Sequence, residues 1–155
     1  MTDANDYQLE WAREQLGDVK RTLDAADDEL QGYVASPSNS ITQCQQCIEI
    51  SAKSIFKLMG VNPPQEHDIS LDHDQTKGLL NSEFPEYFGR KEKIPRVIFL
   101  TQFWHDFYET SKYGKKELNI PPNTLFTNED AERAYKNAKE CYTVADALKQ
   151  TIEQQ

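Results

Sequence analysis

The sequence predicts an all-α fold, an antiparallel up-and-down bundle of four main helices with one shorter helix. Apolar residues recur at spacings of three and four over long stretches, which is the period of a helix with one buried face. No useful length of chain alternates apolar and polar residues as a half-buried strand does. Glycine and proline clusters separate the periodic stretches. Since 155 residues suit one ordinary domain, we expect a single helical domain over residues 1–155.

The first predicted helix runs from about residue 6 to residue 34. Its apolar stripe consists of Ala12, Leu16, Val19, Leu23, Ala26, Leu30 and Tyr33. Asp6 can cap its start, because a side-chain oxygen at that position accepts hydrogen bonds from the first backbone amides. Pro37 and the polar residues around it end this helix and begin the next element.

The second predicted helix begins at Ser38 or Ser40 and ends at Met59, where Gly60 supplies the C-terminal cap. Its buried face is expected to contain Ile41, Cys44, Ile48, Ser51, Ala52, Ile55 and Met59. The segment 61–68 cannot continue the helix, because its two consecutive prolines lack amide donors and fix φ. We expect an ordered loop there.

A shorter helix is predicted over about 72–84, ended by Pro85. Pro95 suits the first turn of a fourth helix that continues to about Tyr113 and is the most aromatic of the chain. The run 97–100 could be a strand by itself, but its amphipathic continuation favours a helix. The expected face of this helix contains Val97, Leu100, Trp104, Phe107 or Tyr108, and Ser111.

Glycine, asparagine and prolines then mark a loop over 115–126, which is long for a plain connection and typical of a functional or partner-contacting segment. The last helix begins at Thr127, which can form a capping box with Asp130. Its near-heptad face consists of Ala131, Ala134, Ala138, Cys141, Ala145, Leu148 and Ile152. The small alanines predict close packing.

Composition and charge restrict the classes of function. No apolar run reaches the roughly 18 residues of a membrane-spanning helix, and the first residues lack the pattern of a signal peptide. We therefore expect a cytoplasmic protein without membrane association, whose three cysteines are reduced thiols. The net charge of -9 argues against a strong grip on duplex nucleic acid, which needs many lysines and arginines at phosphates, but it is compatible with a small local site.

The stretch 45–69 resembles the signature of the HEPN family (higher eukaryotes and prokaryotes nucleotide-binding). In it, a helix carrying Gln, Glu and Lys leads through a glycine and a double proline to His-Asp. The segment 109–114 is similar to the family's Arg-Tyr-Pro segment, and 130–148 is similar to its Ala-rich final helix. The resemblance covers most of the chain from Ser40 onward, and the first predicted helix is consistent with it.

The resemblance implies an antiparallel helical bundle, commonly a homodimer, associated with RNA cleavage or with a nucleotidyltransferase partner. Ribonuclease members of the family carry an arginine, four to six residues, and then a histidine. In this sequence eight residues separate Arg96 from His105, so the chain departs from that motif. On a helix these two residues are about two and a half turns apart and face opposite sides. They could meet only between subunits, and whether the protein is an enzyme stays open.

Five residues are candidates for ligand binding: Glu49, Lys53, His67, Lys112 and Tyr113. Glu49 and Lys53 stand four apart with the acid first, which by itself predicts a surface ion pair, whereas the resemblance suggests a shared polar site. His67 could present its imidazole to a phosphate or to Glu49, or it could cap the next helix.

No cofactor is expected, and no metal site, because His67, Asp72, His73 and Asp74 have no recognisable ligand spacing. Cys44 and Cys47 form a lone Cys-x-x-Cys within a helical pattern. Because neither a second pair nor a βαβ context accompanies them, burial as small hydrophobic residues is the better interpretation.

The densest positive charge flanks the aromatic helix. The leading group consists of Arg90, Lys91, Lys93 and Arg96, and the trailing group consists of Lys112, Lys115 and Lys116. The trailing lysines suit the negative end of the helix dipole, whereas the leading group opposes the positive end, so an anionic partner would compensate it. With Trp104, Tyr108 and Tyr113 nearby, base stacking is physically available, although such aromatics also suit a core or a dimer interface.

The leading hypothesis is a HEPN-like homodimer that binds a nucleotide or RNA, as a component of a nucleotidyltransferase-associated, toxin–antitoxin or defence system. Two alternatives stay open. One is a noncatalytic interaction module whose aromatic helix and 115–126 loop dock a partner protein. The other is a divergent ribonuclease that uses His105 with Arg96 from another subunit.

Overall fold

The computed structural model describes residues 6–32, 36–62 and 73–155. Within these ranges the chain forms helices and turns and no named strand, so the predicted all-α fold is confirmed. The α-helices are α1 (Asp6–Gln31), α2 (Pro37–Leu58), α3 (His73–Leu80), α4 (Ile94–His105), α5 (Tyr108–Tyr113), α6 (Pro122–Leu125) and α7 (Asn128–Glu153). Two short 3-10 turns, η1 (Lys91–Lys93) and η2 (Lys116–Leu118), flank the α4–α5 segment.

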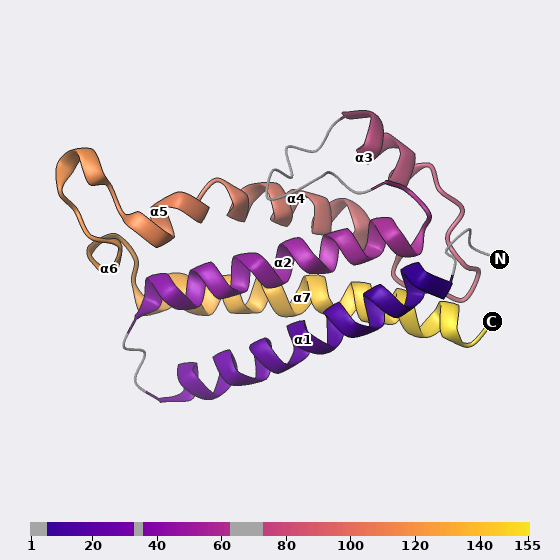
Figure 1. The fold of residues 1–155 in the computed structure, drawn as a ribbon, viewed down its shortest axis with the longest axis horizontal. Helices are drawn as coiled ribbons and strands as arrows, with labels where there is room; N and C mark the ends of the chain where they lie inside the picture. Colours follow the sequence, from indigo (N-terminus) through magenta and orange to yellow (C-terminus); the bar gives the residue numbers. More distant parts are fainter. Residues whose placement is uncertain (1–5, 33–35, 63–72) are drawn as a thin grey trace.

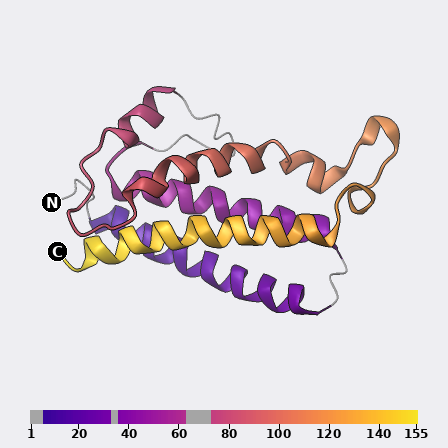
Figure 2. The same cartoon turned by 180° about the vertical axis from the view of Figure 1, so that it is seen from behind.

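The long helices form an antiparallel up-and-down bundle, as predicted. Helix α2 is the central element and packs against α1, α7, α4 and α5. Helices α4 and α5 lie in line along one edge of the bundle, and α1 lies on the opposite edge (Figure 1). The view from behind shows the same order, with α7 beside α2 (Figure 2). That residues 1–155 make a single domain stays a prediction.

The core forms where the predicted stripes meet. The α1 residues Ala12, Leu16 and Val19 are almost fully buried, as are Ile48 and Phe56 of α2. On the predicted alanine face of α7, the exposed fraction is 0% for Ala131, Ala134, Ala138 and Ala145. Small side chains there allow the α7 backbone to approach α2 closely, which confirms the predicted close packing. Each large apolar side chain buried in this core stabilises the fold by roughly 1.5–3 kcal/mol.

Two predicted helix ends are confirmed by their hydrogen bonds. Gly60 has φ of 70°, its amide donates to the Lys57 carbonyl, and the next amide donates to the Phe56 carbonyl. This is a Schellman motif, in which a glycine accepts the left-handed backbone that ends a helix. At the start of α7, Thr127 and Asp130 form the reciprocal capping box.

The prediction of one continuous fourth helix is wrong, because the structure has two helices in this segment. Helix α4 ends at His105 and α5 begins at Tyr108, with a tight turn in which the Phe107 amide donates to the Trp104 carbonyl. The break allows the Ser111 hydroxyl to lie 2.8 Å from the Thr42 hydroxyl of α2, a contact between elements that helical periodicity cannot reveal.

Three further boundaries differ from the predictions. Helix α3 ends at Leu80 rather than near residue 84, because the Ser82 hydroxyl donates to the Gly78 carbonyl and closes the last turn. Helix α1 begins at Asp6, which therefore lies in the first turn instead of preceding it, and ends at Gln31. The expected 115–126 loop contains η2 and α6.

Some expectations fall on residues 33–35 and 63–72, among them the double-proline loop and His67, and these lie outside the described residues. Across the described part of the chain, none of the helices has the length and apolar character needed to cross a bilayer. In the same residues, no cluster of three or more metal-ligating side chains occurs. Cys44 and Cys47 lie in the hydrophobic core as free thiols, as predicted.

Candidate functional site

The Glu49–Lys53 pair lies at the middle of α2 and is mostly shielded from water. The Lys53 Nζ atom is 3.0 Å from Glu49 Oε1, and the exposed fractions of the two side chains are 20% and 7%. The Gln45 amide donates to Glu49 Oε2 at 3.5 Å, which adds a third polar side chain to the row. The pair is therefore less exposed than the surface ion pair that the spacing alone predicts.

Lys57 continues this row of α2 and was not singled out by the sequence. Its Nζ atom lies 3.8 Å from the centroid of the Trp11 ring of α1. Burial lowers the pKa of Lys57, and the neighbouring Lys53 charge lowers it further. The spacing of four residues from Lys53 could have placed Lys57 on the same face of α2. Its aromatic partner Trp11 comes from another helix, however, and spacing along α2 does not reveal such a contact.

The second candidate region is α5 with the turn that follows it. Lys112 donates a hydrogen bond of 2.5 Å to the Tyr108 hydroxyl, which raises the pKa of Lys112. One turn later, the Lys116 Nζ atom lies 4.4 Å from the centroid of the Tyr113 ring. The Tyr113 side chain is 54% exposed. Two lysine–tyrosine pairs therefore lie next to each other on the surface.

The turn after α5 has a fixed backbone. Gly114 has φ of 70°, and a side chain there would collide with the Ile120 carbonyl. The Lys115 amide donates to the Ile120 carbonyl at 2.9 Å, and the Ile120 amide donates back at 3.1 Å. Asn123 of α6 ties the end of this segment to α2, because its side-chain oxygen accepts from the Ser38 amide and hydroxyl. The surface presented by α5 is thus preformed.

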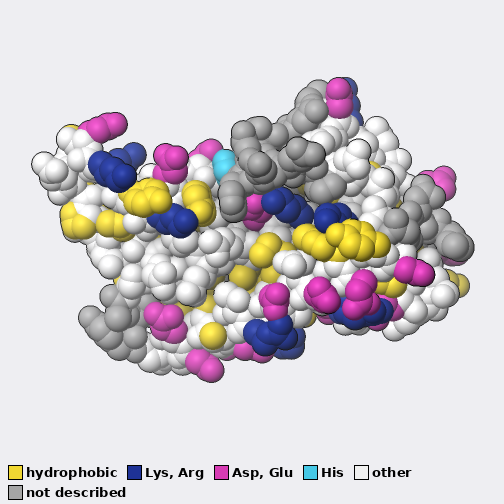
Figure 3. Space-filling model, in the orientation of Figure 1, with side chains coloured by type: hydrophobic (Ala, Val, Ile, Leu, Met, Phe, Trp, Pro, Cys, Tyr) yellow, Lys and Arg dark blue, Asp and Glu magenta, His cyan; other side chains and the backbone are white. Residues whose placement is uncertain are grey.

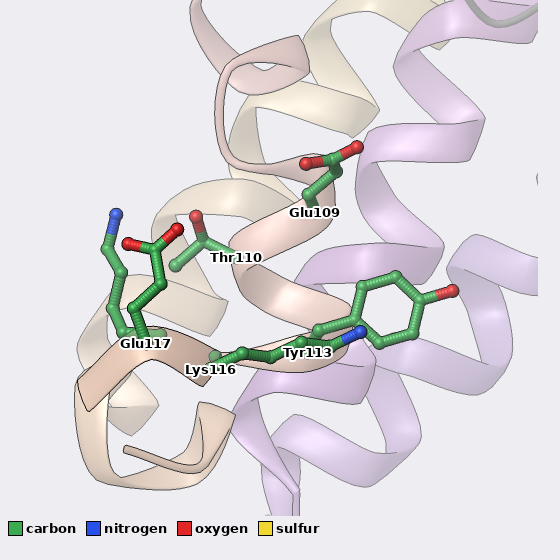
Figure 4. Close-up of a pocket in the computed structure, with 7 residues that line it drawn as sticks. Glu109, Thr110, Tyr113, Lys116 and Glu117 are labelled. Atoms are coloured by element: carbon green, nitrogen blue, oxygen red, sulfur yellow. The ribbon is translucent and has the colours of Figure 1, made fainter. Parts of the chain in front are cut away.

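Residues of α5 and of this fixed turn line an open pocket of about 320 Å³. Its lining residues are Glu109, Thr110, Tyr113, Gly114, Lys115, Lys116 and Glu117. Figure 4 shows the Lys116 side chain reaching toward the Tyr113 ring. On the face shown in Figure 3, lysine and arginine side chains lie among hydrophobic ones over α5 and the segment after it. The region offers aromatic rings and ammonium groups together.

Comparison with known proteins places the chain in a family. A family model described as HEPN domain matches residues 13–148, which is most of the chain. The chain belongs to the HEPN domain family. No curated protein and no solved structure matches the chain. The predicted resemblance is thereby confirmed, and the helical bundle is the fold of this HEPN domain.

The candidate residues of this HEPN domain lie in two places. The hydrogen bond between Thr42 and Ser111 fixes α5 beside the first turns of α2. Lys53 is eleven residues farther along α2 than Thr42, which corresponds to about 16 Å. The Glu49–Lys53 pair is therefore separate from Lys112 and Tyr113, although all four were candidates for ligand binding.

Two aromatic residues expected to be available for stacking are wholly or partly enclosed by the HEPN bundle. Trp104 is only 4% exposed, and its indole nitrogen donates to the Asn137 side chain of α7 at 2.9 Å. Tyr108 is half-buried. Of the three rings that the sequence singled out, Tyr113 is the most accessible to a base.

Arg96 and His105 lie near the two ends of α4 in this HEPN domain and do not converge. The Arg96 Nε atom lies 2.5 Å from Glu140 Oε1 of α7, and this hydrogen bond raises the pKa of Arg96. His105 is the last residue of α4 and is half-buried. Within one chain they form no joint site, as their spacing predicts.

The leading basic group has a partner that the sequence did not predict. Arg90 and Lys93 line an open pocket of about 480 Å³ together with Gln150 of α7 and Gln154, which follows the helix. The last turn of α7 contains no basic residue of its own. Because the carbonyl end of a helix is electronegative, the end of α7 favours cations such as Arg90 and Lys93 in this pocket.

Proposed function

We propose that this HEPN domain binds a nucleotide or single-stranded RNA through α5 and the 114–118 turn. Tyr113 stacks on an unpaired base, while Lys112 and Lys116 contact phosphate. The observation that carries the proposal is the exposed Tyr113 ring with the Lys116 ammonium 4.4 Å from its centroid. Stacking of a base on an aromatic side chain contributes about 1–3 kcal/mol and is independent of sequence.

An unpaired strand suits this surface better than a duplex. Bases in a duplex are already stacked on each other and do not present their faces to a tyrosine. With a net charge of -9, the chain cannot neutralise a long series of phosphates. Two lysines predict a shallow salt dependence, with a slope of about -1.4 in log K against log salt for a single strand.

Fluorescence anisotropy with a labelled oligouridylate tests the proposal, with uridine monophosphate as competitor to separate a nucleotide site from an RNA site. Replacing Tyr113→Ala should weaken binding by about 5-fold to 150-fold, the loss of one stacked base. Tyr7→Ala is the matched control, because Tyr7 is 70% exposed at the far end of α1. Equal binding by the two variants, or no binding by the parent chain, would contradict the proposal.

We propose a second ligand site in the stretch that resembles the family signature, formed by Glu49, Lys53 and His67. In it, Glu49 holds the Lys53 ammonium at a fixed place on α2, and His67 supplies an imidazole. If this site binds the same ligand, Lys53→Met should weaken binding while Lys136→Met on α7 should not. On the basis of its family membership, we also propose that the domain forms a homodimer. We propose further that it acts with a nucleotidyltransferase partner in a toxin–antitoxin or defence system.

A noncatalytic interaction module is the second candidate function, favoured by the exposed Phe99 and Phe103 of α4, which are 56% and 39% exposed. The divergent ribonuclease is tested with the same reagents. Cleavage of the oligouridylate that disappears in His105→Ala would establish it, and binding without cleavage would favour the nucleotide-binding role.

A further inference from the structure

The pocket beside Tyr113 contains two carboxylates to which the proposed function gives no role. Glu109 and Glu117 line it together with Tyr113, and both glutamates are exposed. Within residues 6–32, 36–62 and 73–155, neither carboxylate forms an ion pair. Ionised carboxylate oxygens can only accept hydrogen bonds, so they suit the N–H groups of a ligand.

Glu109 is the carboxylate on the same helix as the Tyr113 ring. The two residues are four apart in α5, which brings their Cβ atoms to about 5–6 Å from each other. Figure 4 shows both on this helix, with Glu117 on the far side of the pocket from the Tyr113 ring. The Lys116 ammonium lies over one face of that ring, 4.4 Å from its centroid. A base stacked on the other face therefore has Glu109 beside its edge.

A carboxylate distinguishes bases by the groups on their pairing edges. Guanine presents two adjacent donors, N1–H and the 2-amino group, which match the two oxygens of one carboxylate. Adenine and cytosine present one amino group beside a ring nitrogen that accepts, and uracil presents one N–H between two carbonyl oxygens. Hydrogen bonds to an ionised acceptor are stronger than neutral ones, and a parallel pair also fixes the orientation of the ligand. A carboxylate at the edge of a stacked base therefore favours guanine.

We propose that the α5 site is specific for guanine, with the base stacked on Tyr113 and its pairing edge bound by the Glu109 carboxylate. This inference rests on the proposed function, because it assigns a specificity to the same site. Lys112 and Lys116 contact the phosphate, and Glu109 contacts the base. A carboxylate in this pocket repels a phosphate, so it favours binding only where it accepts hydrogen bonds from a base.

Calorimetric titration of the full chain with mononucleotides tests the specificity. GMP should bind about 5-fold to 30-fold more tightly than inosine monophosphate, because the two purines stack alike and differ only in the 2-amino group. GMP should also bind more tightly than AMP and UMP, which lack the adjacent pair of donors.

Glu109→Gln should remove the preference, because an amide has a single acceptor oxygen and cannot bind both donors. GMP should then bind no better than inosine monophosphate. The same change removes a negative charge near the phosphate, so UMP should bind at least as tightly as it does to the parent chain. A misfolded variant would instead lose every ligand. Glu132→Gln, at an exposed position on α7, is the control for the lost charge and should keep the preference for GMP.

The outcomes separate this inference from the proposed function. If oligouridylate binding depends on Tyr113 but GMP and inosine monophosphate bind equally, the guanine specificity is overturned and the stacking site stands. A Glu109→Gln variant that still prefers GMP would overturn it as well. If the parent chain binds neither the oligouridylate nor GMP, both proposals fail.

Discussion

Gly114 ends α5 with φ of 70° and ψ of -149°, a backbone conformation that is essentially restricted to glycine. Replacing Gly114→Ala forces one of two responses. Either the residue stays in this conformation at a cost of about 1–3 kcal/mol and pushes against the Ile120 carbonyl, or the turn opens. Opening loses the two hydrogen bonds between Lys115 and Ile120, which contribute about 0.5–1.5 kcal/mol each.

Both responses lead to a similar magnitude, so we expect a loss of about 1–3 kcal/mol in the free energy of unfolding, or about 2–12 °C in Tm for a chain of this size. Urea denaturation followed by circular dichroism measures it. Because the bundle core is untouched, the m-value should not change. Opening of the turn should break the contact between Lys116 and Tyr113, so the binding of an oligouridylate should also weaken.

Two other glycines supply matched controls. Gly89→Ala should change stability by no more than about 0.5 kcal/mol, because nothing lies within 4 Å of the added methyl group. Gly17→Ala, within α1, should stabilise the protein by about 0.5–1 kcal/mol, since alanine is the better helix former. If Gly114→Ala were as stable as the parent chain, the backbone argument for a preformed surface would be refuted.

The remaining predictions concern the core, a cap and pH. Phe56→Ala should cost about 3–5 kcal/mol in urea denaturation, because the ring is 1% exposed and leaves a cavity. Thr127→Ala should cost about 0.5–2 kcal/mol, because it removes the capping box of α7, whereas Thr124→Ala nearby should be neutral. Burial raises the pKa of Cys141 from 9.0 to about 12, so the native state retains a proton that the unfolded state loses and stability should fall as pH rises above 9. Cys141→Ala should lessen that fall by up to about 1.4 kcal/mol per pH unit when unfolding is compared between pH 9 and pH 11.

The helix ends and the alanine face were predictable because their causes are local. Gly60 and Thr127 act on backbone groups within a few residues, so the printed sequence contains the whole interaction. The alanines of α7 repeat with the helical period, which identifies a buried face whatever it packs against. The break between α4 and α5 was not predictable, because the periodicity continues through it and the contact between Ser111 and Thr42 links residues 69 positions apart.

The buried face of α4 was predictable from the apolar period, because Val97, Leu100 and Trp104 recur at spacings of three and four and all three are buried. The structure buries Trp104 against Asn137 of α7 and leaves Phe99, which lies off the predicted face, exposed. The contact between Lys116 and Tyr113 was not predictable in this way, since Lys116 reaches Tyr113 only because Gly114 turns the chain back.

The proposed phosphate contacts at α5 are compatible with the net charge of -9, because the acidic residues lie mostly elsewhere. Asp18, Asp24 and Asp28 are exposed on α1, on the edge of the bundle opposite α4 and α5 (Figure 1). At physiological ionic strength, charges separated by more than about 8 Å of solvent are largely screened. A phosphate at Lys112 and Lys116 therefore responds mainly to those two ammonium groups and to Glu109 and Glu117. If the proposed binding is correct, Lys112, Lys115 and Lys116 outnumber Glu109 and Glu117 at this place, whereas the overall charge of -9 opposes a long polyanion, so a short ligand should bind better than a long one.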